Sequence, residues 1–347
     1  MPMLQRTRTL IVFPLLVTVT AVLPARVQAD APPGGAPADR RQALADARPR
    51  AIEQVLTSAR SDDPFLRANA IEAAQSLPGR ALPLVQLALD DEHPAVRFAA
   101  LVTVGQLRFN AAVPAATRLR DDPVESVRAA ALFALHQCGQ QVDITPLAQA
   151  LAGQSPSARG NAAMLLGMMD DPSAAPMLME LARVSMPKVA SVQEAIVRIQ
   201  VAEAVLKLTE DEVALSALRA GAFSQFDEVR VLAVLALGKI GDRRMKPAIA
   251  RMLEDPPIEL QLAAAEYLAR LGDFEGLSVA LEATGSTLFT VRAQAAMALA
   301  LFGDVRASEA LGRLLADPDE HVRVAAAAAV LRAAPPEAAA GGTAAAG

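Results

Sequence analysis

The sequence is poor in the residues that build redox, metal and base-stacking sites. Its 347 residues include one cysteine, three histidines, one tyrosine and no tryptophan, and aromatic residues make up 3% of the chain. A single cysteine excludes an internal disulfide, a cysteine-based zinc cluster and a CxxC redox pair. Three histidines make a multi-histidine metal site hard to build, and few rings are present to stack on bases. We therefore expect a non-catalytic protein with no metal site and no cofactor.

The charge balance argues against a nucleic-acid partner. The chain has 33 Lys and Arg residues against 38 Asp and Glu, a net charge of -5. Binding to phosphates requires a basic surface, which this balance does not supply. Hydrophobic residues make up 53% of the chain and charged residues 20%, which is ample material for a packed core.

Residues 1–29 have the pattern of a secretory signal peptide. Arg6 and Arg8 precede an unbroken run at 10–23 that is apolar apart from two threonines, and the segment ends at Ala29. A membrane-spanning helix needs about 20 apolar residues, whereas a signal-peptide core needs roughly 7 to 15. The pattern predicts cleavage after Ala29, export by the general secretory route and a periplasmic or extracellular location, with no stable membrane insertion afterwards. An uncut membrane anchor is the alternative.

Composition divides the rest of the chain into three parts. Residues 30–49 begin with a stretch rich in Pro, Gly and Ala and are predicted to be a flexible spacer and N-terminal cap. Residues 335–347 are almost entirely Ala, Gly and Pro, so we expect a disordered tail. Residues 50–334 between them carry a repeating pattern.

The repeat consists of an apolar residue, then arginine, then an alanine-rich run. It occurs nine times, in steps of 30 to 32 residues with one step of 39. In each unit the residue just before the arginine position is apolar, and so are the third, fourth, seventh and tenth residues after it. This spacing places them on one face of a helix. A second helix, often with proline near its start, precedes each of these. The pattern predicts an all-α, right-handed α-solenoid of about nine helix-turn-helix units, an α/α superhelix. The nine arginine positions are Arg67, Arg97, Arg128, Arg159, Arg198, Arg230, Gln261, Arg292 and Arg323.

Two segments carry a resemblance to a known family. Residues 122–131 read Asp-Pro-x-x-x-Val-Arg-x-Ala-Ala and residues 237–242 read Leu-Gly-x-x-Gly-Asp. These motifs resemble the HEAT repeat family, specifically the short bacterial repeats also found in phycobilin-lyase-like proteins, and the resemblance covers residues 50–334. It implies that the Asp of the turn and the Arg of the repeat bond between adjacent units. The residues implied in this role are Asp91, Arg97, Asp122, Arg128, Asp317 and Arg323, while Gln261 interrupts the pattern.

The same resemblance bears on function. HEAT-like hydroxylases carry paired His-Glu dipeptides that bind two irons, and this sequence contains no His-Glu dipeptide. Bilin lyases act on cytosolic chromophore proteins, whereas this chain is expected to be exported. We therefore expect an exported, non-catalytic scaffold or adaptor that binds a protein or peptide partner. The alternatives are an accessory subunit of an enzyme, lyase-like or chaperone-like, and a purely structural spacer.

The partner is expected on the concave face of the second helices. Positions 5 and 9 after the arginine point away from the core stripe, and several neighbouring units place Met, Phe or other apolar residues there. Alternatively, tight curvature buries these residues against one another or against the N-terminal spacer. Glu203, Lys207, Glu266 and Arg270 are expected to form a solvated face that could also steer the partner. The candidate partner-binding residues are Phe98, Val102, Phe133, Met164, Met168, Leu235 and Met297.

The long step between Arg159 and Arg198 indicates an insertion near residues 184–190. Ser191 and Glu194 then have the spacing of a capping box at a fresh helix start. We expect a protruding loop or a longer helix, either on the binding face or as tolerated variation in a surface turn.

Overall fold

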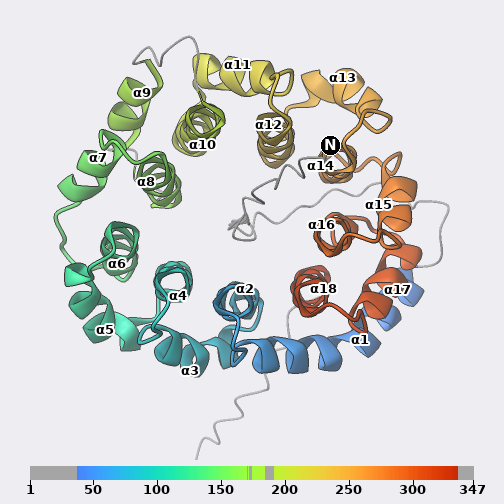
Figure 1. Ribbon diagram of the computed structural model, residues 1–347, viewed down its shortest axis with the longest axis horizontal. Coiled ribbons are helices and arrows are strands. Elements are labelled where there is room, and N and C mark those ends of the chain that lie inside the picture. Colours follow the sequence, from blue (N-terminus) through green and yellow to red (C-terminus); the bar gives the residue numbers. More distant parts are fainter. Residues whose placement is uncertain (1–36, 170, 172–173, 184–190, 335–347) are drawn as a thin grey trace, which may run out of the picture.

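The structure, a computed structural model, describes residues 37–169, 171, 174–183 and 191–334. Within these residues the chain forms eighteen α-helices and no β-strand. The expected signal peptide, tail and insertion at 184–190 lie outside the described residues. Figure 1 shows the helices as two concentric layers of a ring, with odd-numbered helices outside and even-numbered helices inside.

Each unit of the ring pairs one outer helix with the inner helix that follows it. The outer helices are α1 (Pro37–Ser58), α3 (Pro78–Ala88), α5 (Val113–Arg118), α7 (Thr145–Leu151), α9 (Ala175–Arg183), α11 (Glu212–Gly221), α13 (Lys246–Arg251), α15 (Leu277–Ala283) and α17 (Val305–Leu314). The inner helices are α2 (Pro64–Ala73), α4 (Pro94–Leu107), α6 (Glu125–Gln137), α8 (Pro156–Met168), α10 (Val192–Leu208), α12 (Asp227–Ile240), α14 (Ile258–Arg270), α16 (Phe289–Leu299) and α18 (Glu320–Ala333). Short 3-10 turns extend three of these helices: η1 (Ala74–Ser76) follows α2, η2 (Asn110–Ala112) and η3 (Leu119–Asp121) flank α5, and η5 (Arg243–Met245) precedes α13.

The predicted all-α array of helix-turn-helix units is confirmed, but the array is closed. Helix α1 packs against α17 and α18, and α18 packs against α2, so the last unit meets the first. The sequence repeat predicts that neighbouring units stack. It carries no signal for the curvature that brings the first and last units together. None of the described helices combines the length and the apolar character needed to cross a membrane.

The predicted boundary at residue 50 falls inside α1. Residues 37–49, which we expected to belong to a spacer and cap, form the first half of this 22-residue outer helix. Leu44 and Ala47 are buried, with 0% and 1% exposed surface. Pro37 opens this helix, where proline is tolerated, and Pro49 lies within it.

Short polar side chains cap the starts of α2, α8, α10 and α18. The Asp63 carboxylate accepts a hydrogen bond from the N–H of Phe65 at 2.7 Å, and Pro64 opens α2. The Ser191 hydroxyl accepts from the N–H of Glu194 at 3.3 Å, as the spacing after the insertion predicts. These caps satisfy N–H groups that have no partner inside the helix.

Small residues let the inner helices approach closely. A Cβ placed on Gly105 would lie 3.2 Å from the Ala134 Cα of the next inner helix, and one on Gly167 would lie 2.8 Å from the Ala204 Cα. The position three residues after each repeat arginine is buried in every unit, as its small side chains predict. These buried residues are Ala70, Ala100, Ala131, Ala162, Val201, Ala233, Ala264, Ala295 and Ala326.

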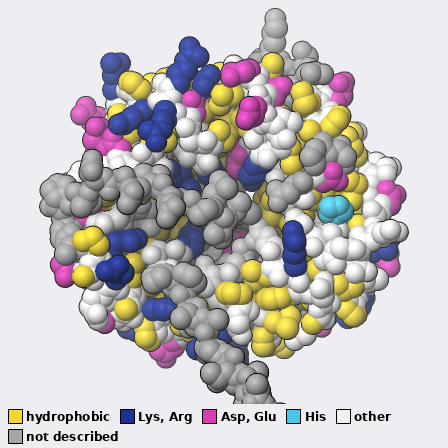
Figure 2. Space-filling model, turned by 180° about the vertical axis from the view of Figure 1, so that it is seen from behind, with side chains coloured by type: hydrophobic (Ala, Val, Ile, Leu, Met, Phe, Trp, Pro, Cys, Tyr) yellow, Lys and Arg dark blue, Asp and Glu magenta, His cyan; other side chains and the backbone are white. Residues whose placement is uncertain are grey.

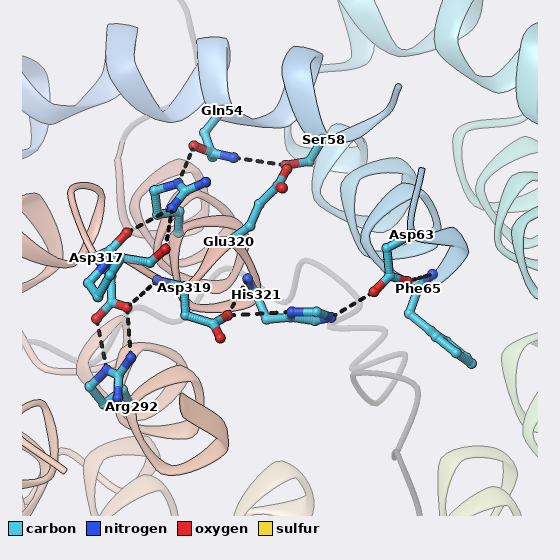
Figure 3. A network of polar contacts seen from close by, with 11 residues as sticks. Gln54, Ser58, Asp63, Phe65, Arg292, Asp317, Asp319, Glu320 and His321 are labelled. Atoms are coloured by element: carbon cyan, nitrogen blue, oxygen red, sulfur yellow. Dashed lines mark hydrogen bonds and ion pairs between the residues drawn. The ribbon is translucent and has the colours of Figure 1, made fainter. Parts of the chain in front are cut away.

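The seam where the ring closes is held by polar contacts as well as packing (Figure 3). Arg323 of α18 donates to the Gln54 side-chain oxygen of α1 at 3.2 Å, and Gln54 donates to the Ser58 hydroxyl at 2.8 Å. That hydroxyl donates to Glu320 of α18 at 2.7 Å. Because Ser58 is fully buried, this chain of hydrogen bonds fixes the register of α1 on α18.

A histidine crosses the same seam near the start of α2. His321 Nε2 lies 3.5 Å from an Asp63 carboxylate oxygen, and its Nδ1 lies 3.4 Å from Asp319 (Figure 3). On its other side the imidazole contacts the ring of Phe289, with 5.4 Å between ring centroids. The first and last units therefore meet through side chains from both sides of the junction.

Candidate binding surface on the inner helices

Four of the seven candidate partner-binding residues are buried. Val102 and Phe133 have no exposed surface, and Met168 and Leu235 are 7% and 9% exposed. The Phe133 ring fills the space left by Gly105, where an added Cβ would lie 2.4 Å from a ring carbon. In the closed ring adjacent inner helices are close enough for this position to face its neighbour. The expected exposed apolar strip is therefore wrong at these four residues, and mutual burial through curvature is what occurs.

The other three candidates stay partly exposed. Phe98 on α4, Met164 on α8 and Met297 on α16 are half-buried and pack against the core from its edge or contact a neighbouring side chain. Met297 accepts a contact from the Arg332 guanidinium, 2.8 Å from the sulfur. They do not form one continuous strip, because α4, α8 and α16 are not neighbours in the ring.

A different set of inner-helix residues comes together as a charged cluster. One Glu203 carboxylate oxygen lies 3.1 Å from the Lys239 ammonium group and 3.5 Å from that of Lys207. Burial alone would raise the pKa of Glu203, but the two lysines hold that pKa below its ordinary value. Two bases thus share one acid across α10 and α12.

The cluster continues across α14, α18 and α2. Arg270 donates to Glu266 at 2.9 Å, one helical turn earlier on α14. Burial lowers the pKa of Arg332, whose charge interacts favourably with Glu266 and Glu72 and unfavourably with Arg270. Burial raises the pKa of Glu72 to about 8, although Arg332 opposes the shift. Glu72 is therefore mostly uncharged at neutral pH.

We call these seven side chains the charged arc. We expected Glu203, Lys207, Glu266 and Arg270 to form a solvated face, but the Glu203, Glu266 and Arg270 side chains are only 11–17% exposed, and Lys207 is 30% exposed. Sequence reasoning found four of its members and did not select the other three as site residues. The available signal was the base nine residues after the repeat arginine, which recurs in four units. The charged arc comprises Glu72, Glu203, Lys207, Lys239, Glu266, Arg270 and Arg332.

The bonds that the family resemblance implies between repeats are present at several junctions. Arg97 donates to both Asp122 oxygens, at 2.8 and 3.1 Å. Arg67 forms the same fork with Asp91, and Arg292 forms it with Asp317. The bond from Arg292 holds the pKa of Asp317 below its ordinary value.

The bonds differ at Arg128 and Arg323. Arg128, like Arg97, donates to two carbonyls of the turn before its own helix, those of Asp122 and Pro123. The next turn carries Gly153 at the position of Asp91 and Asp122, so it offers Arg128 no carboxylate at that position. Arg323 donates to the carbonyls of Asp317 and Pro318, and its next neighbour is Gln54 of the first unit. The ladder of bonds is thus interrupted inside the ring and continued with a neutral partner at the seam.

A second set of bridges, which we did not predict, joins outer helices to the following turn. Arg219 of α11 donates to Asp242 at 2.7 Å, and Lys246 of α13 lies 2.6 Å from Asp273. The hydrogen bond from Arg219 holds the pKa of Asp242 below its ordinary value. Asp242 closes the Leu-Gly-x-x-Gly-Asp motif, so this motif has a bonding role between units.

Within the described residues, no three His, Cys, Asp or Glu side chains are arranged to hold a metal ion. His136 lies 4.0 Å from Asp171, and Cys138 is a half-buried free thiol whose pKa is raised by burial. The polar chemistry available on the inner helices is therefore that of ion pairs and hydrogen bonds.

The repeat geometry agrees with a family profile. The profile described as HEAT repeats matches residues 50–136 and 215–287. These two regions carry HEAT repeats. No curated protein matches it.

Solved structures with similar folds include several other proteins. Human deoxyhypusine hydroxylase is 20% identical over 73% of this chain and 96% of its own, with a TM-score of 0.36. The complex of CpcE and CpcF of phycocyanin lyase from Nostoc sp. PCC7120 is 18% identical over 70% of this chain and 91% of that chain, with a TM-score of 0.39. Kap121p is 15% identical over 80% of this chain and 37% of its own, with a TM-score of 0.35.

Proposed function

We propose that this HEAT-repeat ring is an exported, non-catalytic scaffold that binds a protein or peptide partner on its inner helices. The observation that carries the proposal is the charged arc. Holding charged groups in a largely desolvated wall costs free energy, and replacing such groups by apolar residues is often neutral or stabilising.

The helices α4 and α6 show that the fold can be built without charged groups at these repeat positions. At the same repeat positions α4 and α6 carry Val102 and Phe133, which pack without any charge. The fold therefore does not require Glu203 or Glu266 where they stand. Partly buried charged groups with shifted pKa values that the packing does not need are candidates for a functional surface.

Three partly exposed apolar residues support a protein rather than a small-molecule partner. Phe98, Met164 and Met297 present aromatic and thioether groups from separate inner helices. Such side chains adapt to irregular apolar surfaces. A partner that reaches several inner helices would contact these residues together with the charged arc.

Site-specific photocrosslinking from an inner and an outer position tests partner binding. Benzoylphenylalanine replaces Phe98 on α4 or, as a matched control, the 62%-exposed Phe223 at the end of α11. The purified full chain is irradiated with cell-envelope extract. We expect a discrete crosslinked protein from position 98 and none from position 223. Identical products from both positions, or a product from position 223 alone, would contradict the proposal.

Export is the second part of the proposal and rests on residues 1–29. Fractionation of cells that produce the full chain, followed by N-terminal sequencing, tests it. We expect the protein outside the cytoplasm with Asp30 as its first residue. A chain that stays in the cytoplasm and keeps residues 1–29 would remove the export proposal and leave the binding proposal intact.

A further inference from the structure

The starts of four inner helices are linked in one row where the ring closes. The imidazole of His321 on α18 contacts the Phe289 ring of α16, with 5.4 Å between centroids, and its Nε2 lies 3.5 Å from Asp63 (Figure 3). Asp63 caps α2, and the Phe65 ring in the first turn of that helix contacts the imidazole of His93, which caps α4, at 5.5 Å between centroids. We call this surface the seam edge, and it comprises residues 59–67, 90–97, 284–292 and 315–323.

Two large apolar side chains are exposed on the seam edge. Leu288 and Phe289 have 57% and 39% of their surface exposed. Leu288 occupies the N-cap position of α16 without making a side-chain cap, whereas the neighbouring α2, α4 and α18 each have one. Losing a cap costs stability, and adjacent exposed apolar residues are a feature of interaction surfaces. The seam edge therefore offers apolar and aromatic groups to a partner.

The seam edge also carries more acids than bases. It holds eight Asp and Glu residues against five arginines, one of which is Arg60. The other four are repeat arginines, which donate to Asp91, Asp122, Asp317 and Gln54. One of these bonds leaves the edge, from Arg97 to Asp122, and one enters it, from Arg118 on α5 to Asp90, so the two together leave the excess of acids unchanged.

Helix capping accounts for only part of this acidic charge. Asp63 and Asp319 accept N–H groups at the starts of α2 and α18, where the helix dipole also favours an acid. Asp62 and Glu92 lie one residue before the caps of α2 and α4, make no cap of their own and have exposed side chains. These two acids are therefore not explained by the fold of the helices beside them.

A group of exposed bases lies in another part of the ring. Figure 2 shows Lys and Arg side chains at the upper left of the face opposite to that of Figure 1, in the sector where α11 to α13 lie. Arg243 and Arg244 of η5 are exposed there. The seam, where α17 and α18 meet α1 and α2, lies in a different sector of Figure 1. These bases of the chain itself therefore do not cover the seam edge.

Rings and carboxylates side by side indicate a basic ligand. Arg and Lys side chains are attracted to the faces of aromatic rings and form charge-assisted hydrogen bonds with carboxylates. Four neighbouring inner helices, with axes about 8 to 10 Å apart, span roughly 24 to 30 Å. About eight residues of an extended peptide cover that distance at about 3.3 Å per residue. The phosphates of a nucleic acid would be repelled by the same carboxylates.

We propose that the seam edge binds a basic segment of the partner, with Arg or Lys side chains against the Phe289 and Phe65 rings and near Asp62 and Glu92. This inference rests on the proposed scaffold function and names the chemistry of the partner. Phe98, the position chosen for crosslinking, lies in the second turn of α4, whose start belongs to the seam edge. A partner on the inner helices can therefore reach both.

Fluorescence anisotropy with the full chain tests the proposal. The ligand is a fluorescein-labelled oligoarginine of about eight residues, long enough to cover the seam edge. We expect binding that weakens as salt is raised. Asp62→Asn with Glu92→Gln should weaken binding about tenfold. Phe289→Leu, which keeps an apolar side chain but removes the ring, should weaken it roughly threefold.

Matched controls separate a local effect from the overall charge of the chain. Glu210→Gln with Glu212→Gln removes the same charge from exposed positions between α10 and α11, and Phe223→Leu removes a 62%-exposed ring after α11. Both controls should leave affinity unchanged. All substituted side chains are exposed, so the circular dichroism of every variant should match that of the wild type. Equal losses in the test and control variants, or no binding of the oligoarginine, would overturn the proposal.

The pattern of losses also decides the chemistry of the ligand. Binding that responds to Phe289→Leu, but neither to salt nor to Asp62→Asn with Glu92→Gln, would overturn the assignment to a basic segment and indicate an apolar one.

Crosslinking separates this proposal from the scaffold function. A protein crosslinked at position 98 and still recovered in full with the Asp62→Asn, Glu92→Gln variant would leave the scaffold function standing and remove the basic-segment inference. Absence of a crosslinked protein at position 98 in the wild type would count against the scaffold function itself, while the oligoarginine result would still decide whether the seam edge binds basic segments.

Discussion

The two sides of the inner wall use the same repeat for different purposes. On α4 and α6 the fifth position after the repeat arginine is Val102 or Phe133, and both are buried between helices. On α10 and α14 the same position is Glu203 or Glu266, each paired with bases. The residue three positions after the repeat arginine is buried on both sides, as alanine on α4, α6 and α14 and as Val201 on α10. Fold and surface chemistry are therefore encoded at separate positions, so one can vary without the other.

The largest expected loss of stability comes from a substitution on α4 and α6, the apolar side of the inner wall. Phe133→Ala removes a fully buried ring that packs on Gly105, and we expect it to lower the free energy of unfolding by about 3 to 5 kcal/mol. Urea denaturation followed by circular dichroism measures the change. Phe223→Ala, at an exposed position, is the matched control and should change stability by less than about 0.5 kcal/mol. Comparable losses in the two variants would show that Phe133 is not packed as described.

On the charged side, substitution of Glu72 should raise the stability of the folded chain instead of lowering it. Its pKa in the folded chain is about 8, raised from 4.5, so between these pH values the folded chain holds a proton that the unfolded chain has released. Wild-type stability is then lost progressively as pH rises through this range. Glu72→Gln cannot ionise, and we expect it to match wild type near pH 4 and to exceed it by roughly 3 to 5 kcal/mol at pH 9.

Thermal unfolding of the Glu72→Gln variant at several pH values checks this expectation. Glu309→Gln, on the exposed side of α17, serves as the control for loss of an acid. A Glu72→Gln variant that is less stable than wild type at pH 9 would mean that the ionised carboxylate is well paired, contrary to the description of the charged arc.

Removing one Arg–Asp bond between adjacent repeats should have a smaller effect on the free energy of unfolding. Asp317→Asn removes the carboxylate that receives both bonds from Arg292, and we expect a loss of about 1 to 3 kcal/mol at pH 7. The pKa of Asp317 is lowered in the folded chain, so its contribution is present above its ordinary pKa and is lost as pH falls through the folded value. The difference from wild type should shrink in acid, as measured by urea midpoints. An unchanged difference at low pH would contradict an ionic origin.

The smallest expected effect on stability comes from Lys207. Its side chain is 30% exposed and shares Glu203 with Lys239, so we expect Lys207→Gln to change the free energy of unfolding by less than about 1 kcal/mol. Urea denaturation followed by circular dichroism measures the change. A loss well above about 1 kcal/mol would contradict the description of Lys207 as a partly exposed member of a shared ion pair.

The sequence predicts the repeat well because the repeat is local. Alanine at the close-packed position and apolar residues on one stripe define each helix pair, and they need no knowledge of distant units. The burial of Phe133 depends on Gly105, which belongs to the preceding unit, and on how tightly adjacent helices approach. Ring closure depends on contacts such as Arg323 with Gln54, 269 residues apart, for which the sequence offers no periodic signal.

The charged arc was only partly predictable for the same reason. Glu203 with Lys207 and Glu266 with Arg270 are one helical turn apart and visible in sequence. Arg332 and Glu72 lie on the last and first inner helices and interact because the ring closes. Their relation follows from tertiary structure alone.

Closure of the ring is the central claim, because both sides of the inner wall depend on it. Gln42 of α1 and Glu309 of α17 line one groove across the seam, so spin labels at Gln42→Cys and Glu309→Cys in a Cys138→Ser background report closure by pulsed electron paramagnetic resonance. Labels at Gln42→Cys on α1 and at Phe223→Cys just after α11 give the long-distance reference, because α1 and α11 lie on opposite sides of the ring in Figure 1. We predict one narrow, short distance for the seam pair. A broad distribution at long distance would mean an open solenoid and would contradict the account.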